Sequence, residues 1–323
     1  MIKQAVILAG GMGTRLKDVT KKMPKGFLEI ENISIVEHSI KKLISNGVEE
    51  IIIGTGHCSE WYDKLAEKYP AVIRTVRNDD YSETSSMGTL SVCAPLINDD
   101  FFLLESDLIY DEIGLKVLIN DNHQDVILAS GKTYSFDEVY LDINDDNILT
   151  KVSKNESEFD NPNTELVGIS KISKVLLNKM VNFYNNKLDS YKKIDYENVL
   201  EILAKNYPVY VHKIDFYAWA EIDDKRMFKR AIEEIYPRIV ESENLHRIKR
   251  EVLLNPGPST NSDSVKYAQV CADICPREVE FGVLMEEIEK DLTSFAADVD
   301  EYVTILFASS GTGNQKKFKA LKL

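Results

Sequence analysis

Short apolar runs recur along the first half of the chain, several of them followed by glycine or acidic residues, and they predict buried strands. These runs cover residues 3–9, 50–54, 71–76, 101–104 and 125–129. Segments 34–46, 59–68 and 85–96 between them are typical of helices. The first begins with the capping box Ser34-Ile35-Val36-Glu37 and stops at Gly47. This alternation predicts an α/β fold with an open, mostly parallel sheet.

Ligands of such sheets bind beyond the carboxyl ends of the strands, which indicates the loops at 10–16, 77–89 and 105–110 as the site. The later part of the chain is less regular. Segments 138–152 and 208–220 look like antiparallel strands that would cover this site.

The pattern also predicts where domains end. An amphipathic helix is expected over 224–241, with one face formed by Met227, Ala231, Ile235 and Tyr236. The polar stretch that follows predicts a linker, and a new segment begins at Val252. We therefore expect a domain over 1–240, a linker over 241–251 and a separate segment over 252–323.

Composition narrows the possible partners. The chain has 323 residues, of which 44% are hydrophobic, but no apolar stretch of membrane-spanning length. A net charge of −14 argues against nucleic-acid and anionic-membrane partners. The spacing of Cys58, Cys93, Cys271 and Cys275 matches neither a zinc site nor a redox pair. Together with the absence of a signal-peptide pattern, this favours a cytoplasmic protein with reduced thiols.

The loop after the first strand is a candidate phosphate-binding site. Gly10, Gly11 and Gly13 allow backbone N–H groups to approach phosphate oxygens closely. Arg15 could bind a phosphate through two hydrogen bonds. Neither the Walker pattern nor the dinucleotide-binding pattern is present. On its own, the loop could equally be a tight strand-to-helix turn, but Lys25, held in extended chain by Pro24, could reach the same phosphate site.

Leu8 to Leu16, together with Pro24-Lys25, resembles the L-x-G-G-x-G-T-R-L…P-K signature of nucleotide-sugar pyrophosphorylases and small-molecule cytidylyltransferases. The resemblance covers about residues 1–240 and implies a Rossmann-like nucleotidyltransferase domain with a mixed, mostly parallel sheet. It implies that Arg15 and the loop hold the triphosphate, and that Lys25 neutralises the α-phosphate and the attacking group. The loop residues concerned are Leu8, Ala9, Gly10, Gly11, Gly13 and Thr14.

Such a transfer joins two anions, so a metal ion is expected. Asp107 ends an apolar strand, and Glu221 and Asp223 point to the same side of an extended segment. Three carboxylates suit Mg²⁺. Asp223 or Asp224 could instead cap the helix that begins near Lys225. The segment from Trp219 to Asp223 also resembles the phosphocholine cytidylyltransferase branch, with an aromatic residue, a Glu and an Asp before the last helix.

The nucleotide base and ribose are expected in the loop over 78–89. Gly88-Thr89 resembles the Gly-Thr found there in many relatives, and Ser86 could either bind nucleotide or cap the helix. We predict nucleotide contacts from Tyr81, Ser86, Gly88, Thr89 and Ser106. The sequence does not distinguish cytosine from uracil or thymine.

The acceptor is suggested by the end of the chain. Leu253 to Ser259, Cys275 to Phe281 and Ser309 to Gly313 resemble class V, pyridoxal-phosphate-dependent aminotransferases, and above all 2-aminoethylphosphonate transaminases. About seventy residues cannot form that domain, so we expect a truncated N-terminal segment with no functional pyridoxal-phosphate site and no transaminase activity. The two resemblances together imply CTP and 2-aminoethylphosphonate as substrates.

Contacts with the acceptor are predicted from the strands over the site. Asp142 could pair with a primary ammonium, and Lys132 or Lys154 with the phosphonate, beside Tyr140. Phosphocholine would favour an aromatic cage instead, for which Tyr217 and Trp219 are candidates. Each could also be a solvated strand residue. A phosphocholine or sugar-1-phosphate acceptor, a non-catalytic nucleotide-binding module and a homo-oligomer all stay open.

Overall fold

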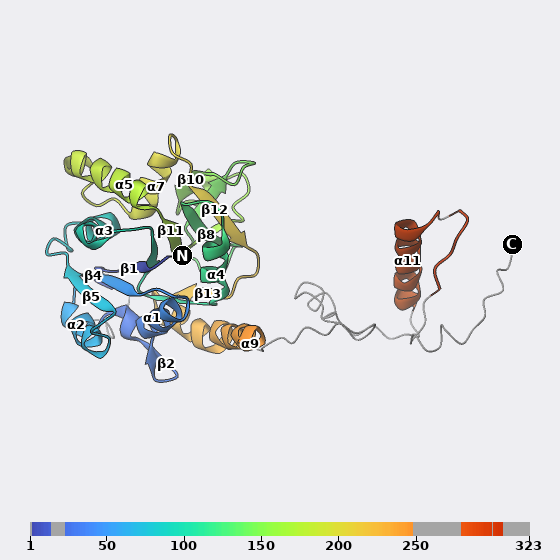
Figure 1. Ribbon diagram of the computed structural model, residues 1–323, viewed down its shortest axis with the longest axis horizontal. Helices are drawn as coiled ribbons and strands as arrows, with labels where there is room; N and C mark the ends of the chain where they lie inside the picture. The colour runs from blue at the N-terminus through green and yellow to red at the C-terminus, as the bar shows by residue number, and fades with distance from the viewer. Residues whose placement is uncertain (1, 14–22, 248–278, 299, 306–323) are drawn as a thin grey trace. The chain divides into compact units, whose positions relative to one another are not determined.

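The computed structural model describes residues 2–13, 23–247, 279–298 and 300–305, which fall into two compact units, Met1–Lys249 and Arg250–Leu323. The first unit is built around a mixed sheet (Figure 1). Its parallel part has the order β6–β1–β4–β5. These strands are β6 (Phe101–Glu105), β1 (Gln4–Ala9), β4 (Glu50–Thr55) and β5 (Ile73–Arg77). The predicted fold class is confirmed.

The other half of the sheet is mostly antiparallel. Strand β11 (Glu165–Ile172), which the sequence did not predict, pairs antiparallel with β6 and with β8 (Val126–Ser130). As expected, β9 (Tyr140–Ile143) and β10 (Leu149–Ser153) are antiparallel. The expectation for 208–220 was half wrong. Strand β12 (Tyr210–Ile214) runs parallel to β8, and only β13 (Trp219–Glu221) is antiparallel, to β7 (Leu108–Tyr110).

Helices cover both faces of the sheet (Figure 1). Side chains of a strand alternate between faces, so Val6 and Leu8 enter one core while Ala5 and Ile7 enter the other. The first core contains residues of α3 (Ser86–Cys93), α5 (Lys174–Asn186) and α7 (Tyr196–Ala204). The second contains residues of α1 (Ile35–Ser45), α2 (Ser59–Lys68) and α4 (Ile113–Asn120). The short helix α6 (Leu188–Tyr191) precedes α7.

The predicted capping box is wrong in its hydrogen bond, although the helix begins where expected. Ser34 is the N-cap of α1, but its side chain makes no cap hydrogen bond. Ser34 belongs to a hairpin of β2 (Glu29–Ile30) and β3 (Ile33–Ser34). That hairpin brings the carbonyl of Leu28 within 2.9 Å of the first helical N–H, at Ile35, and this backbone bond satisfies the donor.

The first unit ends later than the polar composition indicates. Helix α8 (Lys225–Arg230) continues through a π-helical turn (Ala231–Ile235) into α9 (Tyr236–Arg247). Residues 241–247 of the expected linker are therefore helical. Within this helix, Glu243 lies 2.6 Å from Lys42 Nζ and accepts a hydrogen bond from the N–H of Glu112. A polar stretch can therefore be helical when its charged side chains form such contacts.

In the second unit, α11 (Val279–Ala296) is followed by a segment in which Thr304 N–H donates to Thr293 Oγ1 at 2.9 Å. The aminotransferase-like motifs at 253–259 and 309–313, and all but the last residues of 275–281, lie outside the described residues. No helix in the described part of the chain is long and apolar enough to cross a membrane.

Candidate active site

A cavity of about 480 Å³ lies at the carboxyl ends of β1 and β6. It brings together most of the residues that the sequence singled out. Those that line it are Leu8, Ala9, Gly10, Gly11, Gly13, Lys25, Tyr81, Ser86, Thr89, Ser106, Asp107, Lys154, Trp219, Glu221 and Asp223. Thr14 and Arg15 lie outside the described residues.

The glycine loop forms one wall of the cavity with α3. A Cβ atom at Gly10 would lie 2.5 Å from Thr89 Oγ1, so only glycine allows this approach. Asn78 donates to Thr84 Oγ1 at 2.9 Å and to Thr89 Oγ1 at 3.2 Å, which ties the 78–85 loop to the same helix. Gly88 does not line the cavity. Its missing Cβ leaves room for the Thr84 side chain, so Gly88 positions the loop.

The serines at the start of α3 do not cap the helix with their side chains. Ser85 is the N-cap without a side-chain cap bond. Instead Ser85 Oγ and Ser86 Oγ both donate to Asp195 Oδ1, the latter at 3.0 Å. Asp195 also lines the cavity, and the sequence reasoning missed it. A carboxylate just before a helix was a signal, but it is equally typical of an N-cap.

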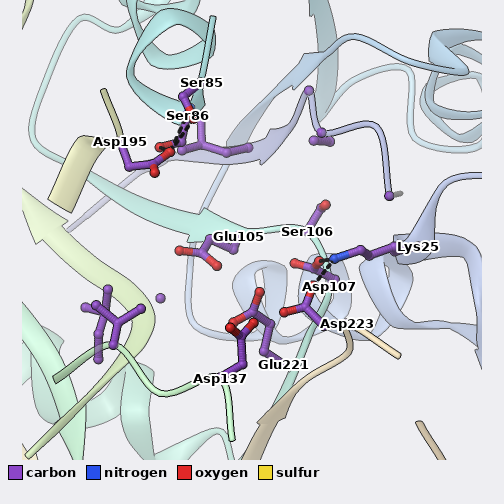
Figure 2. A pocket seen from close by; sticks show the side chains of 18 of the residues that line it. Lys25, Ser85, Ser86, Glu105, Ser106, Asp107, Asp137, Asp195, Glu221 and Asp223 are labelled. Atoms are coloured by element: carbon purple, nitrogen blue, oxygen red, sulfur yellow. Dashed lines mark hydrogen bonds and ion pairs between the residues drawn. The ribbon is translucent and has the colours of Figure 1, made fainter. Parts of the chain in front are cut away.

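Lys25 lies between two carboxylates (Figure 2). Its Nζ is 3.1 Å from Asp107 Oδ2 and also donates to Asp223 Oδ1. Burial lowers the pKa of the Lys25 ammonium, but the charges of Asp107 and Asp223 outweigh this and raise the pKa above its usual range. Lys25 is thus held as a fixed positive charge beside the phosphate loop.

Three carboxylates gather next to this lysine. One oxygen from each of Glu105, Asp107 and Glu221 lies within 4.8 Å of the others. Glu105 is the last residue of β6, and Asp107 lies in the turn between β6 and β7. The β7–β13 pairing adds Glu221, because Ile222 N–H donates to the Asp107 carbonyl at 3.0 Å. The predicted trio included Asp223, which lies outside this group and pairs with Lys25, as Asp107 also does, and it did not include Glu105.

The charges of this trio favour a bound cation. Burial, followed by the charge of Asp107, raises the pKa of Glu105 to about 7. Burial and the neighbouring Glu105 and Asp107 raise the pKa of Glu221 well above its usual range. Carboxylates that repel one another in a buried site are stabilised when a divalent ion joins them. Oxygen donors at these separations fit Mg²⁺.

Several residues predicted to contact the acceptor lie outside the cavity lining. Lys132 pairs with Glu156 at 2.6 Å, and Tyr140 donates to the same carboxylate at 3.4 Å. Asp142 is exposed on the strand edge. Tyr217 is buried and donates to the Asp111 carbonyl at 2.6 Å. Their sequence spacing suited a strand over the site, but these side chains contact neighbours elsewhere.

Lys154 and Trp219 do line the cavity. Lys154 Nζ lies 3.5 Å from Asp137 Oδ1, and Trp219 Nε1 donates to Ser130 Oγ at 2.8 Å. Three further acids that were not predicted also line the cavity: Asp137, Glu165 and Glu197. Burial, with the charges of Asp195 and Glu105, raises the pKa of Glu197 to about 8.

Part of the chain that forms this cavity is similar to known proteins. Residues 4–136 match the family model described as nucleotidyl transferase. This range includes the glycine loop, Lys25 and Asp107. The structure is similar to the inositol-1-phosphate CTP transferase from T. maritima, with a TM-score of 0.64 and 21% identity, covering 74% of this chain and 97% of that one. The chain is an enzyme of the nucleotidyltransferase type.

Cytidylyltransferases are among the relatives of this nucleotidyltransferase. It is 25% identical over 243 residues to the choline-phosphate cytidylyltransferase of Streptococcus pneumoniae, covering 72% of this chain and 97% of the relative. It is also 25% identical over 233 residues to the 2-aminoethylphosphonate cytidylyltransferase of Lancefieldella rimae, covering 68% and 87%. The family match ends before Glu165, Glu197 and Glu221, so these residues are assigned from the structure of this enzyme.

Proposed function

We propose that the enzyme transfers CMP from CTP to 2-aminoethylphosphonate, giving CMP-2-aminoethylphosphonate and pyrophosphate. The observation that carries the proposal is one cavity in which the glycine loop, Lys25 and three gathered carboxylates meet. Relatives named as cytidylyltransferases support CTP as the donor. We place the reaction in the cytoplasm, where nucleoside triphosphates are made.

The proposed chemistry is an in-line displacement. A phosphonate oxygen attacks the α-phosphorus of CTP, and the bond from that phosphorus to the pyrophosphate oxygen breaks. The phosphonate is largely ionised at neutral pH, so no general base is required. Lys25 lowers the repulsion between the two anions, and the backbone N–H groups of the glycine loop bind the departing phosphates. Mg²⁺, held by Glu105, Asp107 and Glu221, would neutralise further charge.

The carboxyl group of Glu197 in the cavity supports an acceptor that carries a primary ammonium. Glu197 lines the cavity, and a neighbouring cation would stabilise its ionised form. An ammonium with three N–H donors can hydrogen-bond to such a carboxylate, whereas a trimethylammonium cannot and favours aromatic faces. Among the described residues, the aromatic side chains lining the cavity are Tyr62, Tyr81 and Trp219. Tyr62 and Trp219 are 1% and 5% exposed, which leaves little ring surface for a cation.

Sequence identity gives no preference between acceptors, since the choline-phosphate and 2-aminoethylphosphonate relatives are both 25% identical. The aminotransferase-like motifs at 253–259 and 309–313 add support for 2-aminoethylphosphonate, because they resemble the transaminase that acts on that compound. Phosphocholine is the second candidate, on the strength of the S. pneumoniae relative.

The test is an acceptor competition. Full-length protein with CTP and Mg²⁺ is given 2-aminoethylphosphonate or phosphocholine, pyrophosphate release is followed, and the product is identified by ³¹P NMR. We expect kcat/KM to be at least about tenfold higher for 2-aminoethylphosphonate, the value of one charge-assisted hydrogen bond. Faster turnover of phosphocholine would overturn the acceptor. Turnover only with another nucleoside triphosphate and a hexose 1-phosphate would overturn both substrates.

A further inference from the structure

A buried tyrosine connects two parts of the cavity. Tyr196, the first residue of α7, is 1% exposed, and its hydroxyl donates to Glu105 Oε1 at 3.0 Å. Its backbone N–H donates to Ser86 Oγ at 2.9 Å. Ser86 Oγ in turn donates to Asp195 Oδ1 at 3.0 Å. Tyr196 therefore touches both the start of α3 and one member of the carboxylate trio.

The Glu105 carboxylate has little freedom on its other side. Gly168 on β11 has φ +82, and a Cβ atom there would lie 3.0 Å from Glu105 Cδ. The absence of a side chain at Gly168 thus leaves room for the carboxyl group, and the hydroxyl of Tyr196 hydrogen-bonds to it. The last torsion of a glutamate side chain is broad, so a single well-placed donor can decide how its oxygens point. In Figure 2, Glu105 lies between the Ser85–Ser86–Asp195 group and Asp107.

We propose that Tyr196 is a positioning residue that orients the Glu105 carboxylate to bind a divalent cation. Its own place is fixed by the backbone bond to Ser86, so the metal carboxylates are tied to the start of α3, where the nucleotide is expected. Removing a group that hydrogen-bonds to a metal ligand commonly lowers metal affinity by about 10-fold to 100-fold. The inference rests on the metal site of the proposed function.

The test measures metal binding without turnover. Mn²⁺, which prefers the same oxygen ligands as Mg²⁺, is titrated into the full chain without nucleotide, and free Mn²⁺ is read by electron paramagnetic resonance. We expect Tyr196→Phe to bind Mn²⁺ about tenfold more weakly than the wild type. The matched control is Tyr207→Phe. Tyr207 also donates to a buried carboxylate, Asp125 Oδ2, at 3.0 Å, but Asp125, unlike Glu105, does not line the cavity. Its Mn²⁺ affinity should equal that of the wild type.

Two more variants distinguish the orientation of Glu105 by Tyr196 from a general loss of structure. If Tyr196 acts through Glu105, then Tyr196→Phe added to Glu105→Gln should weaken Mn²⁺ binding no further, whereas additive losses would overturn the role. Ser86→Ala keeps the tyrosine hydroxyl but removes its anchor, and should weaken Mn²⁺ binding by about threefold. This variant carries the test if Tyr196→Phe does not fold, and an unchanged affinity would then overturn the proposal.

Different results would overturn the metal site and the positioning role of Tyr196. A wild-type protein that binds no Mn²⁺ would overturn the metal site of the proposed function, and the positioning role with it. A wild-type protein that binds Mn²⁺ with the same affinity as Tyr196→Phe would overturn the positioning role alone.

Discussion

The two ends of the cavity are built differently. At the cation end (Lys25, Glu105, Asp107, Glu221 and Asp223), opposite charges lie close together at the ends of β6 and β13, just after these strands, and in the turn after Pro24. At the end that we propose for the acceptor (Lys154, Glu165 and Glu197), the charges come from β11, α7 and the residue after β10. Glu165 is 2% exposed, whereas the Lys154 side chain is 58% exposed. The family match covers part of the first end and none of the second.

This difference indicates a division of labour. Buried charges that are fixed by neighbours can stabilise a transition state without reorganising, so the cation end suits the step shared by all nucleotidyl transfers. The Lys154 charge is more than half exposed, and such a charge contributes less to each contact but can change during evolution with little effect on folding. Substitutions at the first end should therefore affect the reaction with every acceptor, and those at the second should affect acceptor choice.

The largest effect is expected at Lys25. Removing its charge in Lys25→Ala should lower kcat/KM by about 10³-fold with either 2-aminoethylphosphonate or phosphocholine, because a fixed charge at the reacting phosphates is lost. Pyrophosphate release measures this. Lys41→Ala, on the half-exposed side of α1, is the control and should keep full activity. Activity within a few-fold of wild type in Lys25→Ala would remove this lysine from the chemistry.

Removal of divalent cations should come next. Treatment with EDTA is expected to abolish turnover, and added Mg²⁺ should restore it. Glu221→Gln should lower kcat by about 10²-fold and raise the Mg²⁺ concentration needed for half-maximal rate, as loss of a charged ligand predicts. Glu233→Gln, on an exposed carboxylate, serves as the control. Undiminished turnover in EDTA would contradict the metal assignment.

A smaller and more selective effect is expected at Glu197. Glu197→Gln should raise the KM for 2-aminoethylphosphonate by about tenfold, because the amide keeps the size but loses the charge that pairs with the ammonium. The KM for CTP should stay the same. Glu201→Gln, one turn further along α7 and outside the cavity lining, is the matched control. An equal increase in the KM for CTP and in the KM for the acceptor would show that Glu197 supports the packing of the site rather than binding the acceptor.

The smallest effect concerns stability at Glu165. Burial raises the pKa of this carboxyl to about 7, against hydrogen bonds from Thr133 that lower it. The folded state therefore holds the proton more tightly than the unfolded state, so stability falls as pH rises from about 4.5 to 7. Glu165→Gln removes this loss and should be about 1–2 kcal/mol more stable than wild type at pH 8.

Near pH 4 the two proteins should unfold alike, because the wild-type carboxyl is then protonated in both states. Urea unfolding at the two pH values measures the difference. An equal pH dependence of stability in both proteins would show that folding does not raise the pKa of Glu165.

Local pattern was enough for the elements that begin the fold. The first strand and the glycines after it, the helix over 59–68 and the strand before Asp107 all lie where hydrophobic spacing placed them. These features depend on residues a few positions apart, so the local sequence is enough to predict them. Glu105 stands two residues before Asp107, and this closeness in sequence was a usable signal for a second carboxylate that the prediction did not include.

The remaining contacts join distant segments, and only the tertiary structure decides them. Strand β11 in the middle of the sheet was not predicted, because its polar Glu165, Ser170 and Lys171 hide a strand buried on both faces. Asp223 pairs with Lys25 across 198 residues, and Tyr196 reaches Glu105 across 91. No local period specifies such pairs. The sequence determined that a phosphate loop, a lysine and carboxylates are present, and packing of the sheet determined which of them meet, because side-chain partners depend on where strands and helices come together in space.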